Sequence, residues 1–194
     1  MTLRIGLYGG SFNPAHATHL GVSRLALARF RLDRIWWLVA PQNPLKSEAD
    51  MASFADRLAG ARRLVGKNPR IVVSDAEARF GTRYSVDTVR EILRRHPRHR
   101  FVLVAGADIL VQLPRWKRWR RLLRLIPLAI VHRPGFDAPA LRGKVAARLR
   151  RRRRPAGALA DASPPAWHYC WASRSSESAS AIRAGRARDK RSAS

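Results

Sequence analysis

The stretch GGSFNPAHATH, residues 9–19, directly follows the short apolar run Leu3–Tyr8. An apolar run that ends at two glycines predicts a buried strand and then a tight turn. Glycines let a backbone approach a phosphate closely, and the start of the following helix offers unpaired N–H groups. His16 and His19, three residues apart, lie on one side of that helix and can donate hydrogen bonds to phosphate oxygens. The residues themselves favour a phosphate site and a plain strand–helix turn about equally, because neither the Walker nor the dinucleotide-binding spacing is present.

Predicted strands and helices alternate along the first 132 residues. The strands are expected at 3–8, 34–40, 71–74, 101–105 and 128–132, and the helices at 18–30, 53–65, 85–95 and 116–125. This alternation predicts an α/β, doubly wound and mainly parallel sheet with helices on both faces. Ligands gather at the carboxyl ends of such strands. Polar or glycine-rich loops follow three of these ends, at 9–19, 41–47 and 105–108.

The pattern weakens after Leu141. Arg150–Arg154 is a run of like charge, and the following Pro155–Ala158 has the composition of an exposed loop. We expect one last short strand at 167–171, the start of a helix at 178–186 and a disordered tail at 188–194. The chain of 194 residues is thus predicted to form one domain over residues 1–187.

The composition limits the environment and the partners. Lys and Arg number 39 against 13 Asp and Glu, a net charge of +26, which permits binding of any polyanion. Cys170 is the single cysteine and the sequence has no signal-peptide core or membrane-length apolar run, so we expect a cytoplasmic protein. The HxxH spacing could suit zinc, but with no second cysteine and no nearby carboxylate we expect no protein-bound metal.

Six blocks of the sequence, in order, resemble motifs of the nucleotidyltransferase superfamily that includes the nicotinate and nicotinamide mononucleotide adenylyltransferases. The stretch GGSFNPAHATH is similar to its GGxFxPxHxGH signature. The others are Asn43–Lys46 (NPxK), Arg83–Thr88 (SYTxDT), Gly106–Trp116 (GxD…W), His132–Gly135 (RPG) and Ser178–Arg183 (SSTxIR). The resemblance implies a Rossmann-like nucleotidyltransferase fold. It covers residues 3–136 well and 167–187 loosely.

The resemblance also implies roles for individual residues. Those implied in catalysis are His16, His19, Lys46 and Arg183. Those implied in binding ATP are Gly9, Gly10, Ser11, Phe12, His16, His19, Ser178, Ser180 and Arg183. Those implied in binding the second substrate are Asn43, Lys46, Tyr84, Ser85, Asp108, Trp116 and Arg133. Mg²⁺ is expected to arrive with ATP.

The implied reaction transfers the adenylyl group of ATP to nicotinate mononucleotide, giving deamido-NAD and pyrophosphate in NAD biosynthesis. Alternatives are another acceptor, such as nicotinamide mononucleotide or phosphopantetheine, or a non-catalytic basic relative that binds nucleic acid; we rank nucleic acid well behind. Two departures bear on activity: Thr18 and Ala179 stand where the family motifs have glycine and serine. The sequence selects no oligomeric state.

Several of these residues also have plainer interpretations. Trp116 and Trp119 at helical spacing are typical of a core, and Asp108 could cap the following helix. The sequence predicts packing roles for Trp36 and Trp37, and a structural role for a histidine that ends a strand, His132. It predicts surface positions for His96, His99 and His168.

Overall fold

The computed structural model describes residues 1–41, 51–133 and 135–171. In this part of the chain six strands form one sheet in the order β3-β2-β1-β4-β5-β6, and every neighbouring pair is parallel. The strands are β1 Arg4–Gly10, β2 Arg34–Val39, β3 Ile71–Ser74, β4 Arg100–Gly106, β5 Leu128–Val131 and β6 Trp167–Cys170. The predicted doubly wound parallel sheet is confirmed. Its strand order reverses between β1 and β4, the place where such sheets bind ligands.

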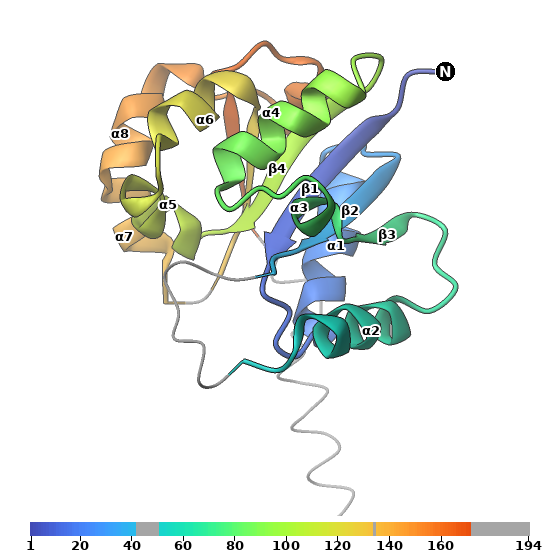
Figure 1. Cartoon of the computed structure of the whole chain (residues 1–194). Coiled ribbons are helices and arrows are strands. Elements are labelled where there is room, and N and C mark those ends of the chain that lie inside the picture. The colour runs from blue at the N-terminus through green and yellow to red at the C-terminus, as the bar shows by residue number, and fades with distance from the viewer. Residues whose placement is uncertain (42–50, 134, 172–194) are drawn as a thin grey trace, which may run out of the picture.

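Helices cover both faces of the sheet (Figure 1). The longer ones are α1 Ala17–Arg29, α2 Phe54–Val65, α4 Ser85–Arg95 and α6 Trp119–Leu125. The shorter ones are α3 Ala76–Arg79, α5 Asp108–Gln112, α7 Asp137–Arg142 and α8 Lys144–Leu149, with 3-10 turns η1 Leu113–Arg115, η2 Arg150–Arg152 and η3 Ala156–Asp161. None of the helices in the described part of the chain is long and apolar enough to cross a bilayer.

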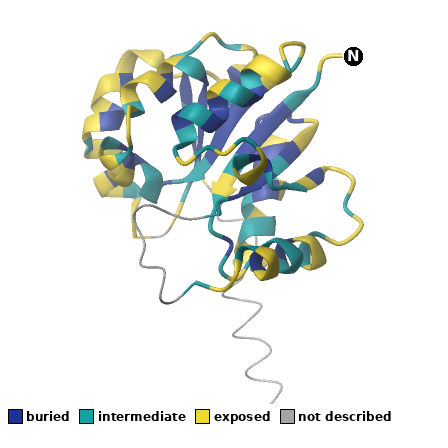
Figure 2. Cartoon of the chain, in the orientation of Figure 1, coloured by how far each residue is buried: buried dark blue, intermediate teal, exposed yellow. Residues whose placement is uncertain are grey.

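Two hydrophobic cores form because alternate residues of each strand point to opposite faces. Ile5 and Leu7 of β1 belong to the core beneath α4, α5, α6, α7 and α8. Trp37 and Val39 of β2 belong to the core beneath α1, which α2 and η3 extend. Strands in the middle of the sheet are covered on both sides, and Figure 2 shows them buried while the outer faces of the helices are exposed. The four residues of β5 are all buried.

The helix predicted to begin at Trp116 begins instead at Trp119. Trp116 is extended, with a ψ of 142°, and Arg118 has a left-handed φ of 53°, so the backbone changes direction between the two tryptophans. The prediction that both lie on one helix was therefore wrong. The spacing of apolar residues did not reveal this break in the helix, because no glycine in the sequence indicates it.

The segment after β5 is more ordered than its composition indicates. It forms α7, α8 and two 3-10 turns before β6. The chain just beyond the predicted loop Pro155–Ala158 enters the core, where Leu159 and Ala160 are buried. Arg153 pairs with Trp167 in a parallel bridge, and Arg150–Arg154 is exposed as its charge predicts. The short strand predicted at 167–171 is confirmed as β6.

Some predictions fall outside the described residues. These are the sites at Asn43, Lys46, Ser178, Ser180 and Arg183, the helix at 178–186 and the tail at 188–194. The extent of the single domain, 1–187, likewise stays a prediction.

Candidate active site

The turn between β1 and α1 brings the two predicted histidines together. His16 is the N-cap residue of α1, and its backbone N–H donates to Nδ1 of His19 over 3.1 Å. The two imidazole rings lie 4.0 Å apart between centroids. His16 is exposed and His19 is half-buried, so both rings reach the surface at the carboxyl end of the sheet. The predicted proximity of His16 and His19 is thus realised in the structure.

The surroundings of His19 determine its charge and its tautomer. Burial lowers the pKa of His19 to about 4, with smaller contributions from His16 and Arg133. The ring is therefore neutral at pH 7 and carries one proton. Because Nδ1 accepts the hydrogen bond from His16, that proton is on Nε2. His19 thus presents an N–H donor, which suits an anionic oxygen.

A buried arginine holds the turn in place. Arg57, on α2, is only 3% exposed. Its Nη1 donates to the carbonyl oxygens of Ser11 and Ala40, both over 2.7 Å. Its Nη2 donates to the carbonyl of Pro41 over 2.7 Å, and Nε donates to that of Ala52 over 3.0 Å. One guanidinium therefore joins the chain after β1, the chain after β2 and the start of α2.

Arg57 was missed by the sequence analysis. It lies in the helix predicted at 53–65, next to its apolar face, where an arginine is ordinarily exposed. Its partners are backbone carbonyls far along the chain, and such partners leave no pattern in the sequence. Asn13 makes a smaller connection of the same kind, because its Oδ1 accepts from the N–H of Ala52 over 3.2 Å.

The ring of Phe12 belongs to the core. It is 1% exposed and stacks on Trp37 with 4.8 Å between centroids. Its φ of 48° is left-handed, which turns the chain sharply after the two glycines. The structure therefore leaves no exposed surface of the Phe12 ring for the predicted contact with ATP. A β-carbon at Gly9, in contrast, would meet no atom of the described residues within 4 Å, so these residues leave the space above this glycine open.

A charged pair occupies the ends of β4 and β5. Nη1 of Arg133 donates to Oδ2 of Asp108 over 2.9 Å. Asp108 does not cap α5 as its plainer interpretation suggested; it accepts from Arg133 and, over 3.3 Å, from Gln112. Gly106 makes room for it, because a β-carbon there would lie 2.6 Å from Oδ1 of Asp108.

Tyr8 connects this pair to the histidines. Its ring lies 6.0 Å from that of His19. Burial raises the pKa of Tyr8 to about 12, and the charges of Asp108 and Arg133 also act on it. Arg133 acts on His19 as well. The ends of β1, β4 and β5 therefore form one electrostatic unit at the point where the strand order reverses. The sequence analysis did not assign Tyr8, which appeared only as a strand residue.

The remaining predicted residues in the described part of the chain lie at the start of α4 and beside η1. Tyr84 is the N-cap residue of α4 and Ser85 is its first residue. The ammonium of Lys117 lies 4.2 Å from the centroid of the Tyr84 ring, so the chain next to Trp116 lies against the start of α4. Trp116 is half-buried and packs against the core beneath α4. Because it is only partly exposed, the Trp116 side chain can pack against the core and also contact a ligand.

A second network fixes the chain after β5. Nδ1 of His132 lies 2.9 Å from Oδ1 of Asp137, and the hydroxyl of Tyr169 donates to the same oxygen. Trp171 packs against both rings, 5.7 Å from His132 and 4.9 Å from Tyr169. The predicted structural role of His132 agrees with these contacts. The network flanks Arg133 and orients the turn that carries it.

The described residues hold no group of three or more His, Cys, Asp and Glu side chains placed to bind a metal ion. The site consists instead of neutral and cationic donors near one paired carboxylate, Asp108.

Comparisons with known proteins identify the family of the chain. The model of the cytidylyltransferase-like family matches residues 7–184. A protein of Gluconobacter oxydans named "Probable nicotinate-nucleotide adenylyltransferase" is 49% identical over 184 residues, which cover 93% of this chain and 94% of that one. One of the same name from Parvibaculum lavamentivorans is 55% identical over 148 residues, 76% of this chain and 73% of that one.

Solved structures show the same fold. The Plasmodium falciparum nicotinic acid mononucleotide adenylyltransferase complexed with NaAD superposes with a TM-score of 0.67 at 18% identity, covering 89% of this chain and 76% of that one. The same enzyme complexed with APC gives a TM-score of 0.66 at 17% identity, covering 90% and 77%. The family model matches most of the chain, near-full-length relatives are almost half identical to it, and the paired histidines lie at the strand reversal. This chain is therefore a nucleotidyltransferase that belongs to the cytidylyltransferase-like family and, within it, to the nicotinate-nucleotide adenylyltransferases.

Proposed function

We propose that the protein transfers the adenylyl group of ATP to nicotinate mononucleotide, giving deamido-NAD and pyrophosphate. The names of the relatives support this acceptor, and the Plasmodium falciparum enzyme has been solved in complexes with NaAD and with APC. The observation that carries the proposal is the pair of histidines at the start of α1, in which the hydrogen bond from His16 to Nδ1 leaves the Nε2–H of His19 as a donor. The proposal places the reaction in the cytoplasm, in agreement with the single cysteine.

The reaction needs no covalent enzyme intermediate. A 5′-phosphate oxygen of the mononucleotide, already ionised at neutral pH, attacks the α-phosphorus of ATP. A P–O bond forms as the bond to the bridging oxygen breaks, and pyrophosphate leaves. Catalysis then consists of positioning and of stabilising negative charge on the phosphoryl oxygens.

In this proposal the His19 Nε2–H donates to an oxygen of the transferring phosphate. A donor fixed before the reaction stabilises the developing charge without reorganising. His16, whose ring lies beside it, contributes a second donor. Gly9 and Gly10 let the triphosphate approach the backbone. Lys46, Ser178, Ser180 and Arg183 would bind the phosphates from segments outside the described residues.

The second substrate is proposed to lie between the ends of β4 and β5 and the start of α4. Trp116 would stack on the pyridine ring, whose positive charge suits an indole face. Tyr84 and Ser85 at the start of α4, together with Asn43, would contact the same nucleotide. Asp108 would accept from ribose hydroxyls while Arg133 binds phosphate, so substrate binding would loosen the pair that these two side chains now form.

Mg²⁺ enters this proposal as part of the substrate, bound to oxygens of the triphosphate. Mg²⁺ prefers phosphate and carboxylate oxygens, and Asp108 is already paired with Arg133. Phosphate oxygens are therefore the better ligands in this site. The metal supplies charge neutralisation on the triphosphate; the imidazoles and arginines bind the oxygens that remain.

The test is pyrophosphate release from ATP with nicotinate mononucleotide, nicotinamide mononucleotide or phosphopantetheine as acceptor. We expect nicotinate mononucleotide to give the highest kcat/KM. His19→Ala is expected to lower kcat by about 100-fold, the range for loss of one fixed oxyanion donor. The matched control is His168→Ala, whose ring binds the Arg154 carbonyl away from this site. Equal turnover by the two variants would remove His19 from the mechanism, and turnover only with another acceptor would overturn the proposed substrate.

A further inference from the structure

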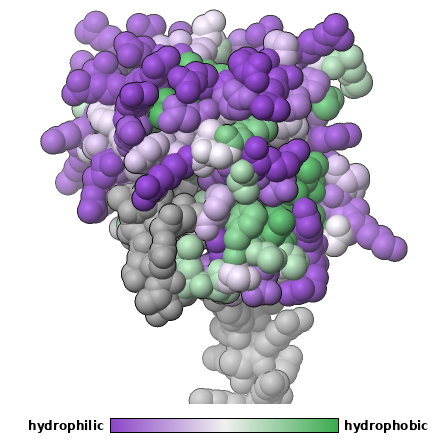
Figure 3. Space-filling view, in the orientation of Figure 1, coloured by the Kyte–Doolittle hydropathy of each residue, from purple (hydrophilic) through white to green (hydrophobic). Residues whose placement is uncertain are grey.

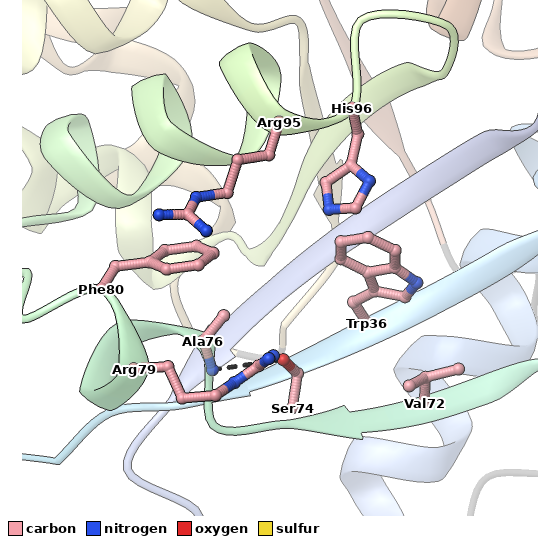
Figure 4. Close-up of a pocket in the computed structure, with 8 residues that line it drawn as sticks. All are labelled: Trp36, Val72, Ser74, Ala76, Arg79, Phe80, Arg95 and His96. Carbon is pink, nitrogen blue, oxygen red and sulfur yellow. Dashed lines mark hydrogen bonds between the residues drawn. The ribbon is translucent and has the colours of Figure 1, made fainter.

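A cavity of about 430 Å³ lies on the face of the sheet beside β2 and β3. Its lining comes from these two strands, from α3 and from the carboxyl-terminal end of α4 (Figure 4). Figure 3 shows hydrophobic side chains gathered on this side of the near face, bordered by hydrophilic ones. The volume is within the range of ligand sites in proteins.

The cavity is separate from the candidate active site. None of its lining residues is among the residues assigned to ATP or to the mononucleotide. Ser85, which is assigned, begins α4, whereas the lining residue Arg95 ends it. Ten residues of helix span about 15 Å, so the length of α4 separates the two places. Trp36 lies in mid-strand, opposite Leu7 of β1, and not at the end of β2.

The walls of the cavity are aromatic. Figure 4 shows Phe80 and Trp36 on opposite sides of the hollow, with His96 above the indole. Trp36 meets His96 edge to face, 5.2 Å between centroids. The prediction that Trp36 is simply packed in the core was incomplete, because the residue is half-buried and lines this space. Burial lowers the pKa of His96, so its imidazole adds no charge at neutral pH. Aromatic side chains on two sides of the hollow favour a flat ligand.

Two guanidinium groups line the cavity, those of Arg79 and Arg95. Nε of Arg79 donates to Asp75 over 2.7 Å, and Nε of Arg95 donates to Glu91 over 2.7 Å. Glu91 also accepts from Arg94 over 2.7 Å. Only one nitrogen of each lining guanidinium is used in these bonds. Within the described residues the terminal nitrogens of Arg79 and Arg95 have no hydrogen-bond partner. Such nitrogens bind a carboxylate well.

We propose that this cavity is a second ligand site, which binds a planar aromatic monocarboxylate between Phe80 and Trp36 with its carboxylate on Arg95 and Arg79. In this proposal the flat ring lies between the two aromatic side chains, and the carboxylate binds to the two guanidinium groups that line the cavity. In this proposal, ligand binding in the cavity does not depend on adenylyl transfer.

The experiment uses 2-naphthoate as the probe and isothermal titration calorimetry on the full chain. The neutral isostere 2-naphthamide tests the charge, and decahydro-2-naphthoate tests the flat shape. We expect 2-naphthoate to bind at least tenfold more tightly than either. Arg95→Gln is expected to weaken its binding about tenfold. Arg94→Gln is the matched control, because Arg94 is the next residue on α4, shares Glu91 and does not line the cavity.

Two further variants locate the bound probe. Trp116→Ala removes the aromatic side chain proposed for the mononucleotide and is expected to leave naphthoate binding unchanged. Arg95→Gln is expected to leave turnover of nicotinate mononucleotide unchanged. Equal losses in Arg94→Gln and Arg95→Gln, equal binding of the amide, or loss of binding in Trp116→Ala would each overturn the second site. Turnover is a separate measurement, so failure of the proposed reaction would not change the interpretation of the binding result.

Discussion

The turn after β1 is held by one guanidinium that binds four backbone carbonyls, whereas the turn after β5 is held by carboxylates that pair with other side chains. Arg57 makes the first set of bonds from a buried position. Asp137 and Asp108 make the second set, to Tyr169, His132 and Arg133, from partly exposed positions. We call the turn after β1 the rigid side, which in the proposed function binds the phosphates, and the turn after β5 the adjustable side, which in the proposed function binds the second substrate.

The largest expected effect is that of Arg57→Ala on the rigid side. The change leaves the carbonyls of Ser11, Ala40, Pro41 and Ala52 without this donor, and buried groups left unpaired cost about 1–3 kcal/mol each where water cannot reach them. We expect the free energy of unfolding to fall by about 3 kcal/mol in urea titrations. Arg62→Ala, an exposed position on the same helix, is the control and is expected to change it by less than about 0.5 kcal/mol. Equal effects would show that Arg57 does not hold the turn.

The local sequence pattern predicted the strands, helix and turn around Arg57, but not the role of Arg57 itself. The strands, the helix at 53–65 and the histidine turn follow from apolar period, glycine and proline. The four carbonyls that Arg57 binds belong to residues up to 46 positions away, so no local rule connects them. The same holds for Tyr8, which gains its place in the site only when β1, β4 and β5 lie side by side.

Short helices and changes of backbone direction could not be predicted from the local sequence pattern either. The left-handed residue before α6 is Arg118, a type that rarely marks a turn. Leu159 is buried by contacts of η3 with β4 and β5, although the preceding arginines and proline indicate an exposed loop. The family motifs, in contrast, predicted Asp108 and Arg133 individually, and the structure shows that they pair.

The second prediction concerns the adjustable side. Tyr169→Phe removes the hydroxyl that donates to Asp137 while keeping the buried ring. Loss of a hydrogen bond to a charged acceptor is expected to lower the free energy of unfolding by about 1.5 kcal/mol. Tyr84→Phe is the control, since its hydroxyl has no hydrogen bond to any described residue and its ring keeps the contact with Lys117. A loss in Tyr169→Phe no larger than in the control would show that the turn after β5 does not depend on this network.

The third prediction uses pH on the rigid side. The pKa of His19 is about 4 in the folded chain and near 6.5 unfolded, so between these values the unfolded chain binds more protons. The stabilisation is complete above pH 6.5 and is lost as the pH falls toward 4. Burial raises the pKa of Glu77 to about 7, which acts in the opposite direction between pH 4.5 and 7.

The measurement is therefore the difference in unfolding free energy between the parent and His19→Gln at each pH, which cancels the contribution of Glu77. We expect this difference to decrease by about 1 kcal/mol from pH 7 to pH 4, after allowing for the partial exposure of His19 to solvent. A difference independent of pH would mean that the pKa of His19 is the same in the folded and the unfolded chain, so that burial does not hold the ring in its neutral form.

The smallest expected effect on folding is that of Gly9→Ala, and it separates the function of the rigid side from its stability. A β-carbon at residue 9 would meet no atom of the part of the chain that the structure describes within 4 Å, so the free energy of unfolding is expected to change by less than about 0.5 kcal/mol. The proposed triphosphate occupies that space, so the KM for ATP is expected to rise about tenfold. Gly21→Ala on α1 is matched, because its β-carbon also meets none of those atoms within 4 Å, yet it lies along the helix and is expected to leave the KM unchanged. Equal KM values in the two variants would mean that the open space above Gly9 is not where ATP approaches the chain.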